Sequence, residues 1–92
     1  DDFASSFRKM LTIEQFRSEE MQKLYQQYLV SGPASYVKDL FDSMGFANAK
    51  NKAVRFYSVM YFYYSIYDGA ADKEKVKVEF VSAIKSLVQE LK

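Results

Sequence analysis

The chain has 92 residues, of which 13 are Lys or Arg and 12 are Asp or Glu, so its formal net charge is +1. A chain of this length forms one domain with a thin core, and its 49% hydrophobic and 17% aromatic residues leave apolar surface for a partner. Charges of both signs are interspersed. We therefore expect no direct nucleic-acid binding by this segment.

The sequence contains no Cys and no His. This removes disulfides, thiolate and imidazole metal ligands, and catalytic triads, so we expect no enzyme, no cofactor and no metal site. The absence of Cys agrees with a cytoplasmic location. The start, Asp1 to Ala4, has neither an initiator Met nor a signal-peptide pattern. We expect one helical domain over residues 1–92 that is part of a longer protein.

Apolar residues at helical spacing predict a short amphipathic helix from Asp2 to Leu11. Thr12 and Gln15 then fit the capping-box pattern. This pattern predicts a turn or a second short helix that carries Ile13 and Phe16.

Ser18, followed by two Glu residues, predicts the start of the next helix. Its apolar stripe comprises Met21, Leu24, Tyr25, Tyr28 and Leu29. Gly32 and Pro33 interrupt this helix, since Pro cannot donate an amide hydrogen and favours the first turn of a helix. A second stripe follows, with Tyr36, Val37, Leu40, Phe41 and Met44. The two segments are either separate helices or one kinked helix.

Gly45 is placed to end this helix, with Phe46 folding back on the preceding turn. Asn48 is predicted to cap a long helix from Ala49 to about Tyr67, covered on more than one face because nearly every residue after Val54 is apolar or aromatic. A turn at Asp68-Gly69 and a cap at Asp72 predict a last amphipathic helix, with Val76, Phe80, Ala83, Ile84, Leu87 and Leu91 as its stripe. The expected fold is an all-α antiparallel bundle of about four to five helices.

The aromatic run from Phe56 to Tyr64 is the most distinctive local feature. It fits a helix packed in a core or against another subunit, and its Tyr residues also suit a ligand pocket. A membrane span is disfavoured, because a span needs about 20 apolar residues. Ser58 and Ser65 lie two turns apart, where small side chains let another helix approach within the chain or from a partner.

Several segments resemble the C-terminal domain of TetR-family transcriptional regulators. These segments are Phe7 to Arg17, Glu20 to Tyr25, Gly32-Pro33, Ala53 to Tyr57 and Ile66 to Gly69, followed by the closing amphipathic helix. The resemblance implies a ligand-sensing and dimerisation domain of a transcriptional repressor, whose last two helices form a four-helix bundle with a second copy. DNA would be contacted only through a helix-turn-helix domain that is not present in this chain.

By this resemblance, the predicted dimer interface comprises Arg55, Ser58, Phe62, Val78, Val81 and Val88. The predicted pocket, for a small apolar or aromatic effector, comprises Tyr25, Tyr28, Tyr57, Met60, Tyr61 and Tyr64. An alternate rotation of either helix would exchange the two sets. The alternative function is a helical scaffold that binds another protein and has no small-molecule site. A fragment of an enzyme, completed by residues outside the chain, is the least favoured reading.

Overall fold

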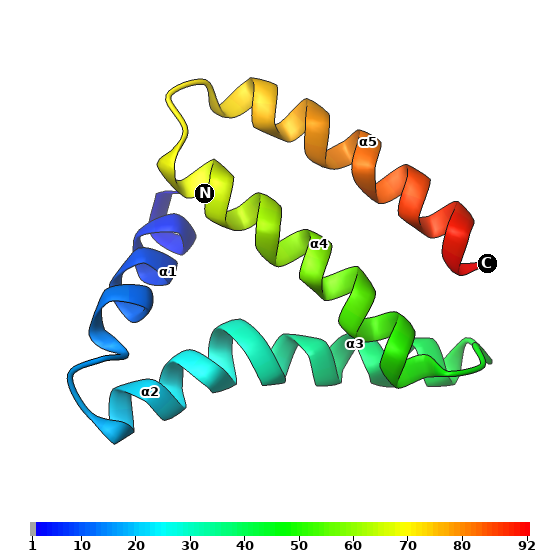
Figure 1. Cartoon of the computed structure of the whole chain (residues 1–92), viewed down its shortest axis with the longest axis horizontal. Coiled ribbons are helices and arrows are strands. Elements are labelled where there is room, and N and C mark those ends of the chain that lie inside the picture. Colours follow the sequence, from blue (N-terminus) through cyan, green and yellow to red (C-terminus); the bar gives the residue numbers. More distant parts are fainter. Residues whose placement is uncertain (1) are drawn as a thin grey trace.

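The computed structural model describes residues 2–92, which form an all-α bundle and no strand (Figure 1). This confirms the predicted fold class. The elements are α1 (Asp2–Glu14), α2 (Glu19–Tyr25), the π-helical segment η1 (Gln26–Val30), α3 (Ser31–Ser43), α4 (Ala49–Gly69) and α5 (Lys73–Leu91).

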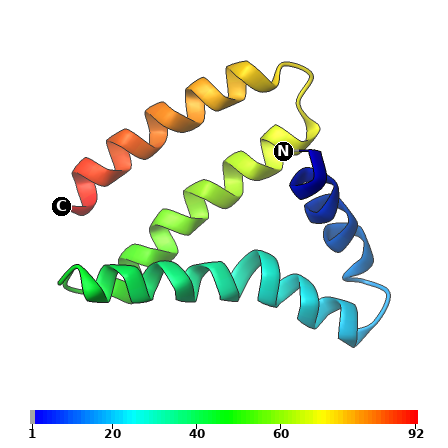
Figure 2. The same ribbon diagram turned by 180° about the vertical axis from the view of Figure 1, so that it is seen from behind.

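Three helical arms enclose a triangle, and a fourth lies outside it (Figures 1 and 2). The arms are α1, the long helix made of α2, η1 and α3, and α4; α5 runs antiparallel beside α4. Helix α4 is the central element, because it packs against α1, α3 and α5. The prediction that this helix is covered on more than one face is therefore confirmed.

The molecule is flat, with extents of 39 × 33 × 17 Å. Its radius of gyration is 14.4 Å, whereas a compact domain of this length has about 12 Å. Its accessible surface of 6509 Å² likewise exceeds the roughly 5,500 Å² typical of a 10.7 kDa monomer. About 1,000 Å² more surface than usual is thus open to a ligand or a partner.

The core lies where the end of α3, the start of α4 and the end of α5 meet. It is built from Phe41, Ala49, Ala53, Leu87 and Leu91. Both alanines are buried on α4, where their small side chains let α3 and α5 approach its backbone closely. The rings of Phe46 and Phe56 close over Phe41, at centroid distances of 5.1 and 5.7 Å.

Local capping signals end and begin most helices as predicted. The Ser18 side chain accepts a hydrogen bond from the Met21 amide at 3.1 Å, and the Asp72 carboxylate accepts one from the Lys75 amide, also at 3.1 Å. Gly45 has a φ of +80°, the left-handed conformation that favours glycine after a helix. Phe46 folds back as predicted, and its backbone amide donates a hydrogen bond to the carbonyl of Phe41.

One capping prediction was wrong, and a second, at Asn48, was confirmed in position only. Thr12 does not start a new helix, because α1 continues through Glu14 and the Thr12 hydroxyl donates to the carbonyl of Arg8. The side-chain amide of Gln15 donates a hydrogen bond to the carbonyl of Thr12. In a capping box the Gln15 side chain would instead accept a hydrogen bond from the backbone amide of Thr12. Asn48 precedes α4 with a φ of 53°, but its side chain makes no capping hydrogen bond.

The interruption at Gly32-Pro33 takes the form of a π-helical turn within one continuous helix. In η1 the helix widens, and the Ser31 amide bonds to the carbonyl of Gln26, five residues back. A Cβ atom at position 32 would lie 1.9 Å from the Gln27 carbonyl oxygen, so this geometry requires glycine. The long helix is therefore one helix with a bulge, which resolves the alternative that the sequence left open.

Candidate functional site

A groove of about 500 Å³ opens inside the triangle of helices. Helix α1 contributes Phe3, Ala4, Phe7 and Arg8, and α4 contributes Phe56, Tyr57, Met60 and Tyr64. The bulged helix supplies the third wall, with Tyr28, Leu29, Pro33, Tyr36 and Val37. Apart from Arg8 and the tyrosine hydroxyls the walls are apolar, and the volume lies within the range of about 300–1,000 Å³ of small-molecule sites.

Four of the six residues predicted to form a pocket line this groove: Tyr28, Tyr57, Met60 and Tyr64. The other two, Tyr25 and Tyr61, lie beside it, with their hydroxyl groups hydrogen-bonded to each other. The Tyr61 ring meets the ring of Tyr57 edge-on at 6.3 Å. Tyr61 therefore contacts the groove wall through Tyr57, and neither Tyr25 nor Tyr61 lines the groove.

The wall formed by α1 was not predicted. Phe7 meets the Tyr28 ring edge-on at 5.9 Å and stacks on Phe3 at 6.3 Å. The apolar spacing of Phe3 and Phe7 indicated that α1 is amphipathic, but gave no indication that its apolar face closes on the long helix and α4. That arrangement depends on the direction in which the chain leaves the turn at residues 15–18, which the Ser18 cap does not specify.

One hydrogen bond joins the groove wall to the bulge in the long helix. The Tyr57 hydroxyl donates to the backbone carbonyl of Leu29. Burial, followed by the effect of neighbouring tyrosines, raises the pKa of Tyr57 to about 12. Its hydroxyl thus stays protonated at neutral pH and, with its proton engaged by Leu29, positions the ring.

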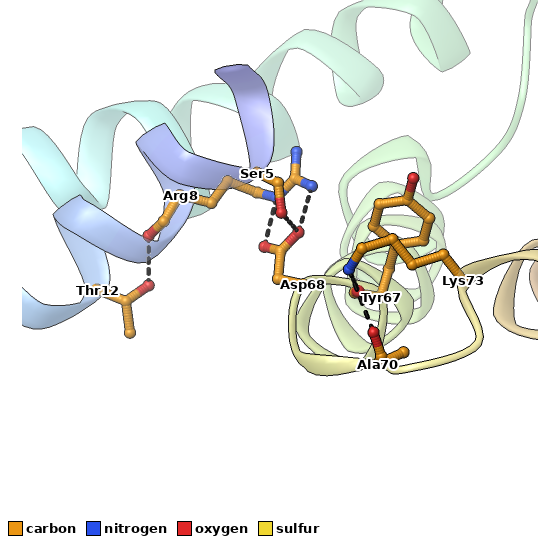
Figure 3. Close-up of polar contacts among 7 residues, drawn as sticks. All are labelled: Ser5, Arg8, Thr12, Tyr67, Asp68, Ala70 and Lys73. Carbon is orange, nitrogen blue, oxygen red and sulfur yellow. Dashed lines mark hydrogen bonds and ion pairs between the residues drawn. The ribbon is translucent and has the colours of Figure 1, made fainter. Parts of the chain in front are cut away.

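A polar cluster fastens α1 to the end of α4 (Figure 3). Arg8 donates to both carboxylate oxygens of Asp68, with Nε–Oδ2 at 2.8 Å and Nη2–Oδ1 at 2.6 Å. The Ser5 hydroxyl donates to Oδ1 as well, and this serine is only 6% exposed. Bidentate pairs of this kind combine charge with a fixed geometry.

The cluster also sets the charge state of its members. The hydrogen bond with Asp68 raises the pKa of Arg8. Burial acts to raise the pKa of Asp68, but the hydrogen bonds from Arg8 and Ser5, together with the Arg8 charge, bring it below its ordinary value. The guanidinium also lies over the ring of Tyr64, 4.7 Å from its centroid. The positive charge of Arg8, at the edge of the groove, is therefore balanced by the carboxylate of Asp68.

The loop after α4 is closed by a second polar contact, drawn in the same view (Figure 3). The Lys73 ammonium donates to the carbonyl of Tyr67 at 2.7 Å and lies 4.8 Å from the centroid of the Tyr67 ring. This satisfies a carbonyl at the end of α4 and orients the start of α5.

The opposite side of α4 carries an exposed stripe beside α5. A shallow groove of about 490 Å³ runs between the two helices, lined by Ser58, Phe62, Ser86 and Glu90 among others. Phe62 is 56% exposed, and Val54 and Ile66 are also exposed. At the rim, Arg55 pairs with Glu90 at 3.2 Å. Three residues of the predicted interface, Arg55, Ser58 and Phe62, thus lie together on one face.

The three predicted interface residues of α5 lie elsewhere. Val78 is exposed and about 80° around the helix from Ser86, while Val81 and Val88 are about 140–160° away from it. Val88 borders a different shallow groove, with Ile84 and Lys85. The predicted interface therefore does not form one continuous face: its α4 half faces one side of the molecule, and Val81 and Val88 face another.

Within residues 2–92, no group of three or more acidic side chains comes together as it would around a metal ion. No helix in that part of the chain has the length and hydrophobicity to span a membrane. Comparison of the chain with protein families, with curated proteins and with solved structures finds no match.

Proposed function

We propose that this chain is a ligand-sensing and dimerisation module of a transcriptional repressor of the TetR type. The observation that carries the proposal is the double role of α4. One side of this helix lines the aromatic groove with Tyr57, Met60 and Tyr64, and another side presents Ser58 and Phe62 beside α5. A single rigid element thus connects a small-molecule site to a surface suited to a second copy of the chain.

The exposed stripe on α4 has the composition of a helix-packing surface. Val54, Phe62 and Ile66 offer apolar side chains, and Ser58 and Ser65 are small enough for close approach. The molecule's excess surface of about 1,000 Å² compares with the roughly 800 Å² that each partner buries in a stable complex. A homodimer through α4 and α5 would cover this stripe.

The proposed mechanism is a shift between two dimer geometries. A ligand bound in the groove contacts α1 and α4 and favours one position of α4. Because α4 also forms the dimer face, this position determines the geometry of the dimer. In regulators of this type the changed geometry alters the spacing of DNA-reading domains, which lie outside these residues. The residues described above take part in binding and transmission, and no catalytic step is involved.

Sedimentation equilibrium of the 92-residue chain and two matched variants tests the dimer. Phe62→Glu places a charge on the α4 face, and Val81→Glu places one at a similarly exposed valine, 51% exposed, on the other side of α5. We expect wild-type and Val81→Glu chains to dimerise and Phe62→Glu to be a monomer with unchanged helical circular dichroism, because burying an unpaired charge is strongly unfavourable. A wild-type monomer, or a dimer indifferent to Phe62→Glu, contradicts this interface.

Linkage tests the sensing half of the proposal. A ligand that favours one dimer geometry changes the dimer dissociation constant, and dimerisation changes the ligand affinity by the same factor. The dissociation constant is measured with and without a saturating groove ligand. Equal dissociation constants would contradict the sensing role, and dimerisation would remain as the only proposed role.

A helical scaffold that binds another protein is the second candidate function. The observation that favours it is the exposure of Tyr36, Leu40 and Met44, which are spaced four residues apart along α3 and its C-terminal cap, with Tyr36 also lining the groove. A protein partner would recognise such a stripe as one face of an amphipathic helix. A chain that binds no small molecule in its groove and does not dimerise through Phe62 would support this function.

A further inference from the structure

The walls of the groove favour a flat aromatic ligand. Phe7 and Tyr28 meet edge to face on one side, and Phe56, Tyr57 and Tyr64 lie along α4 on the other. Aromatic side chains interact best with another ring that stacks or meets them edge-on. The site therefore suits a planar molecule of about two fused rings more than a branched or flexible one.

The charge balance of the groove disfavours an ionised ligand. Among residues 2–92, Arg8 is the only charged side chain that lines it, and Asp68 already neutralises Arg8 through two hydrogen bonds. An anion entering the groove would have to compete with Asp68, and a cation would find no carboxylate in the lining. Either ion would lose its hydration without gaining a counter-charge, because Asp68 already balances the charge of Arg8.

One nitrogen of the Arg8 guanidinium, Nη1, can nevertheless donate a hydrogen bond to a ligand. Asp68 engages Nε and Nη2, whereas Nη1 points away from the carboxylate and has no partner among the described residues (Figure 3). The Tyr57 hydroxyl, by contrast, is already committed to the Leu29 carbonyl. The guanidinium is thus a fixed donor at the edge of an otherwise apolar site.

We propose that the groove binds an uncharged, planar aromatic molecule that carries a carbonyl or a similar acceptor, and that Arg8 donates a hydrogen bond to this acceptor while Asp68 holds the guanidinium in place. The inference rests on the proposed ligand-sensing function and adds the chemical class of the ligand. Asp68 is a positioning residue in this scheme, and it also keeps anions out of the site.

Three probes of one shape test the proposal: 2-acetylnaphthalene, 2-ethylnaphthalene and 2-naphthoate. Their affinities are measured by displacement of prodan, a neutral fluorescent naphthyl ketone. On the wild-type chain we expect the ketone to bind about tenfold more tightly than the ethyl compound, as for one hydrogen bond from a charged donor. We expect naphthoate to bind more weakly than the ketone.

Two variants assign the effect to Arg8 and Asp68. In Arg8→Gln/Asp68→Asn the cation and anion are removed together, and the advantage of the ketone should fall to within about twofold. In Asp68→Asn alone the guanidinium loses its counter-ion, so naphthoate should become the tightest of the three probes. Lys77→Gln, which removes a lysine outside this groove, should leave the order unchanged.

The outcomes separate this inference from the function on which it rests. Equal binding of ketone and ethyl compound, or an advantage that persists in the double variant, overturns the role of Arg8 while leaving a ligand site. Met60→Trp narrows the groove and should abolish prodan binding with unchanged helical circular dichroism. No saturable binding to the wild-type chain, or binding unaffected by Met60→Trp, overturns both the inference and the proposed sensing function.

Discussion

The hydroxyl group of Tyr57 on α4 donates a hydrogen bond to the backbone carbonyl of Leu29 in η1. In a regular α-helix this carbonyl would accept the amide hydrogen of residue 33, but residue 33 is proline and has none. A side chain from another helix therefore satisfies the acceptor that Pro33 leaves free. This contact ties the bulge of the long helix to the wall of the groove.

Removing that hydroxyl should destabilise the fold. Tyr57→Phe leaves the Leu29 carbonyl buried without a donor, so we expect the free energy of unfolding to fall by about 1–3 kcal/mol in urea titrations. Tyr63→Phe is the matched control, since the Tyr63 ring stacks on Phe80 and its hydroxyl makes no comparable bond in the described structure. Equal losses in the two variants would mean that the bond to Leu29 contributes nothing.

The π-helical turn should depend on Gly32. A Cβ atom there would overlap the Gln27 carbonyl oxygen, so Gly32→Ala is expected to lower the free energy of unfolding by at least about 2 kcal/mol. Gly69→Ala is the control, because a Cβ atom at that position meets nothing within 4 Å. It should be neutral or stabilise the chain by up to about 1 kcal/mol. Thermal unfolding followed by circular dichroism measures both, and a harmless Gly32→Ala would contradict the close contact.

The cluster around Asp68 should make stability depend on acid pH. Its pKa in the folded chain lies below the value of about 3.9 expected in the unfolded chain. Its contribution is therefore complete above about pH 4 and is lost as the pH falls through the lower folded-state pKa. The urea midpoint of the wild-type chain should fall more steeply between about pH 5 and pH 2 than that of Asp68→Asn. Parallel curves would show that Asp68 is not coupled to folding.

Breaking the same ion pair at neutral pH should also have a measurable effect. Arg8→Gln leaves a largely buried carboxylate with weaker partners, and we expect a loss of about 1–2 kcal/mol in urea titrations at pH 7. Lys38→Gln is the control, since its pair with Asp42 is exposed and should leave stability unchanged. A loss from Lys38→Gln as large as that from Arg8→Gln would contradict the special role of α1 docking.

Two tyrosines should lose their protons at a higher pH in the folded chain than in the unfolded chain. Burial is the main cause that raises the pKa of both Tyr57 and Tyr61 to about 12, and the hydrogen bond with Tyr25 adds to it for Tyr61. A raised folded-state pKa contributes stability that is present below the unfolded value of about 10 and is lost as the pH rises toward 12. Stability should therefore decline over this interval, and less so in Tyr57→Phe/Tyr61→Phe. Phenolate absorbance in the two chains measures the difference.

Local signals made much of the helical framework predictable. Ser18, Gly45 and Asp72 act on amides and carbonyls within a few residues, so their roles follow from the sequence next to them. The π-helical turn was only partly predictable. Gly32 and Pro33 indicated an interruption, but the Leu29 carbonyl in the bulge is satisfied by the Tyr57 hydroxyl, which lies 28 positions further along the chain.

The candidate site was predictable only in part, because its walls come from distant segments. Tyr57, Met60 and Tyr64 were predicted from the aromatic run, whereas Phe7 and Arg8 were missed. Arg8 and Asp68 are separated by 60 positions, and no spacing rule relates residues so far apart. The packing of α1 on α4 alone brings them together.

The sequence by itself determined where the helices lie and which of them are amphipathic, since backbone hydrogen bonding, caps and apolar periodicity act over one or two turns. Only the tertiary structure decided how α4 is rotated. Tyr64 and Phe62 belong to the same unbroken aromatic run, yet the first lines the groove and the second lies on the exposed face beside α5. A helix that is apolar on nearly every side carries no periodicity to orient it, so the helices packed around it set which face becomes site and which becomes surface.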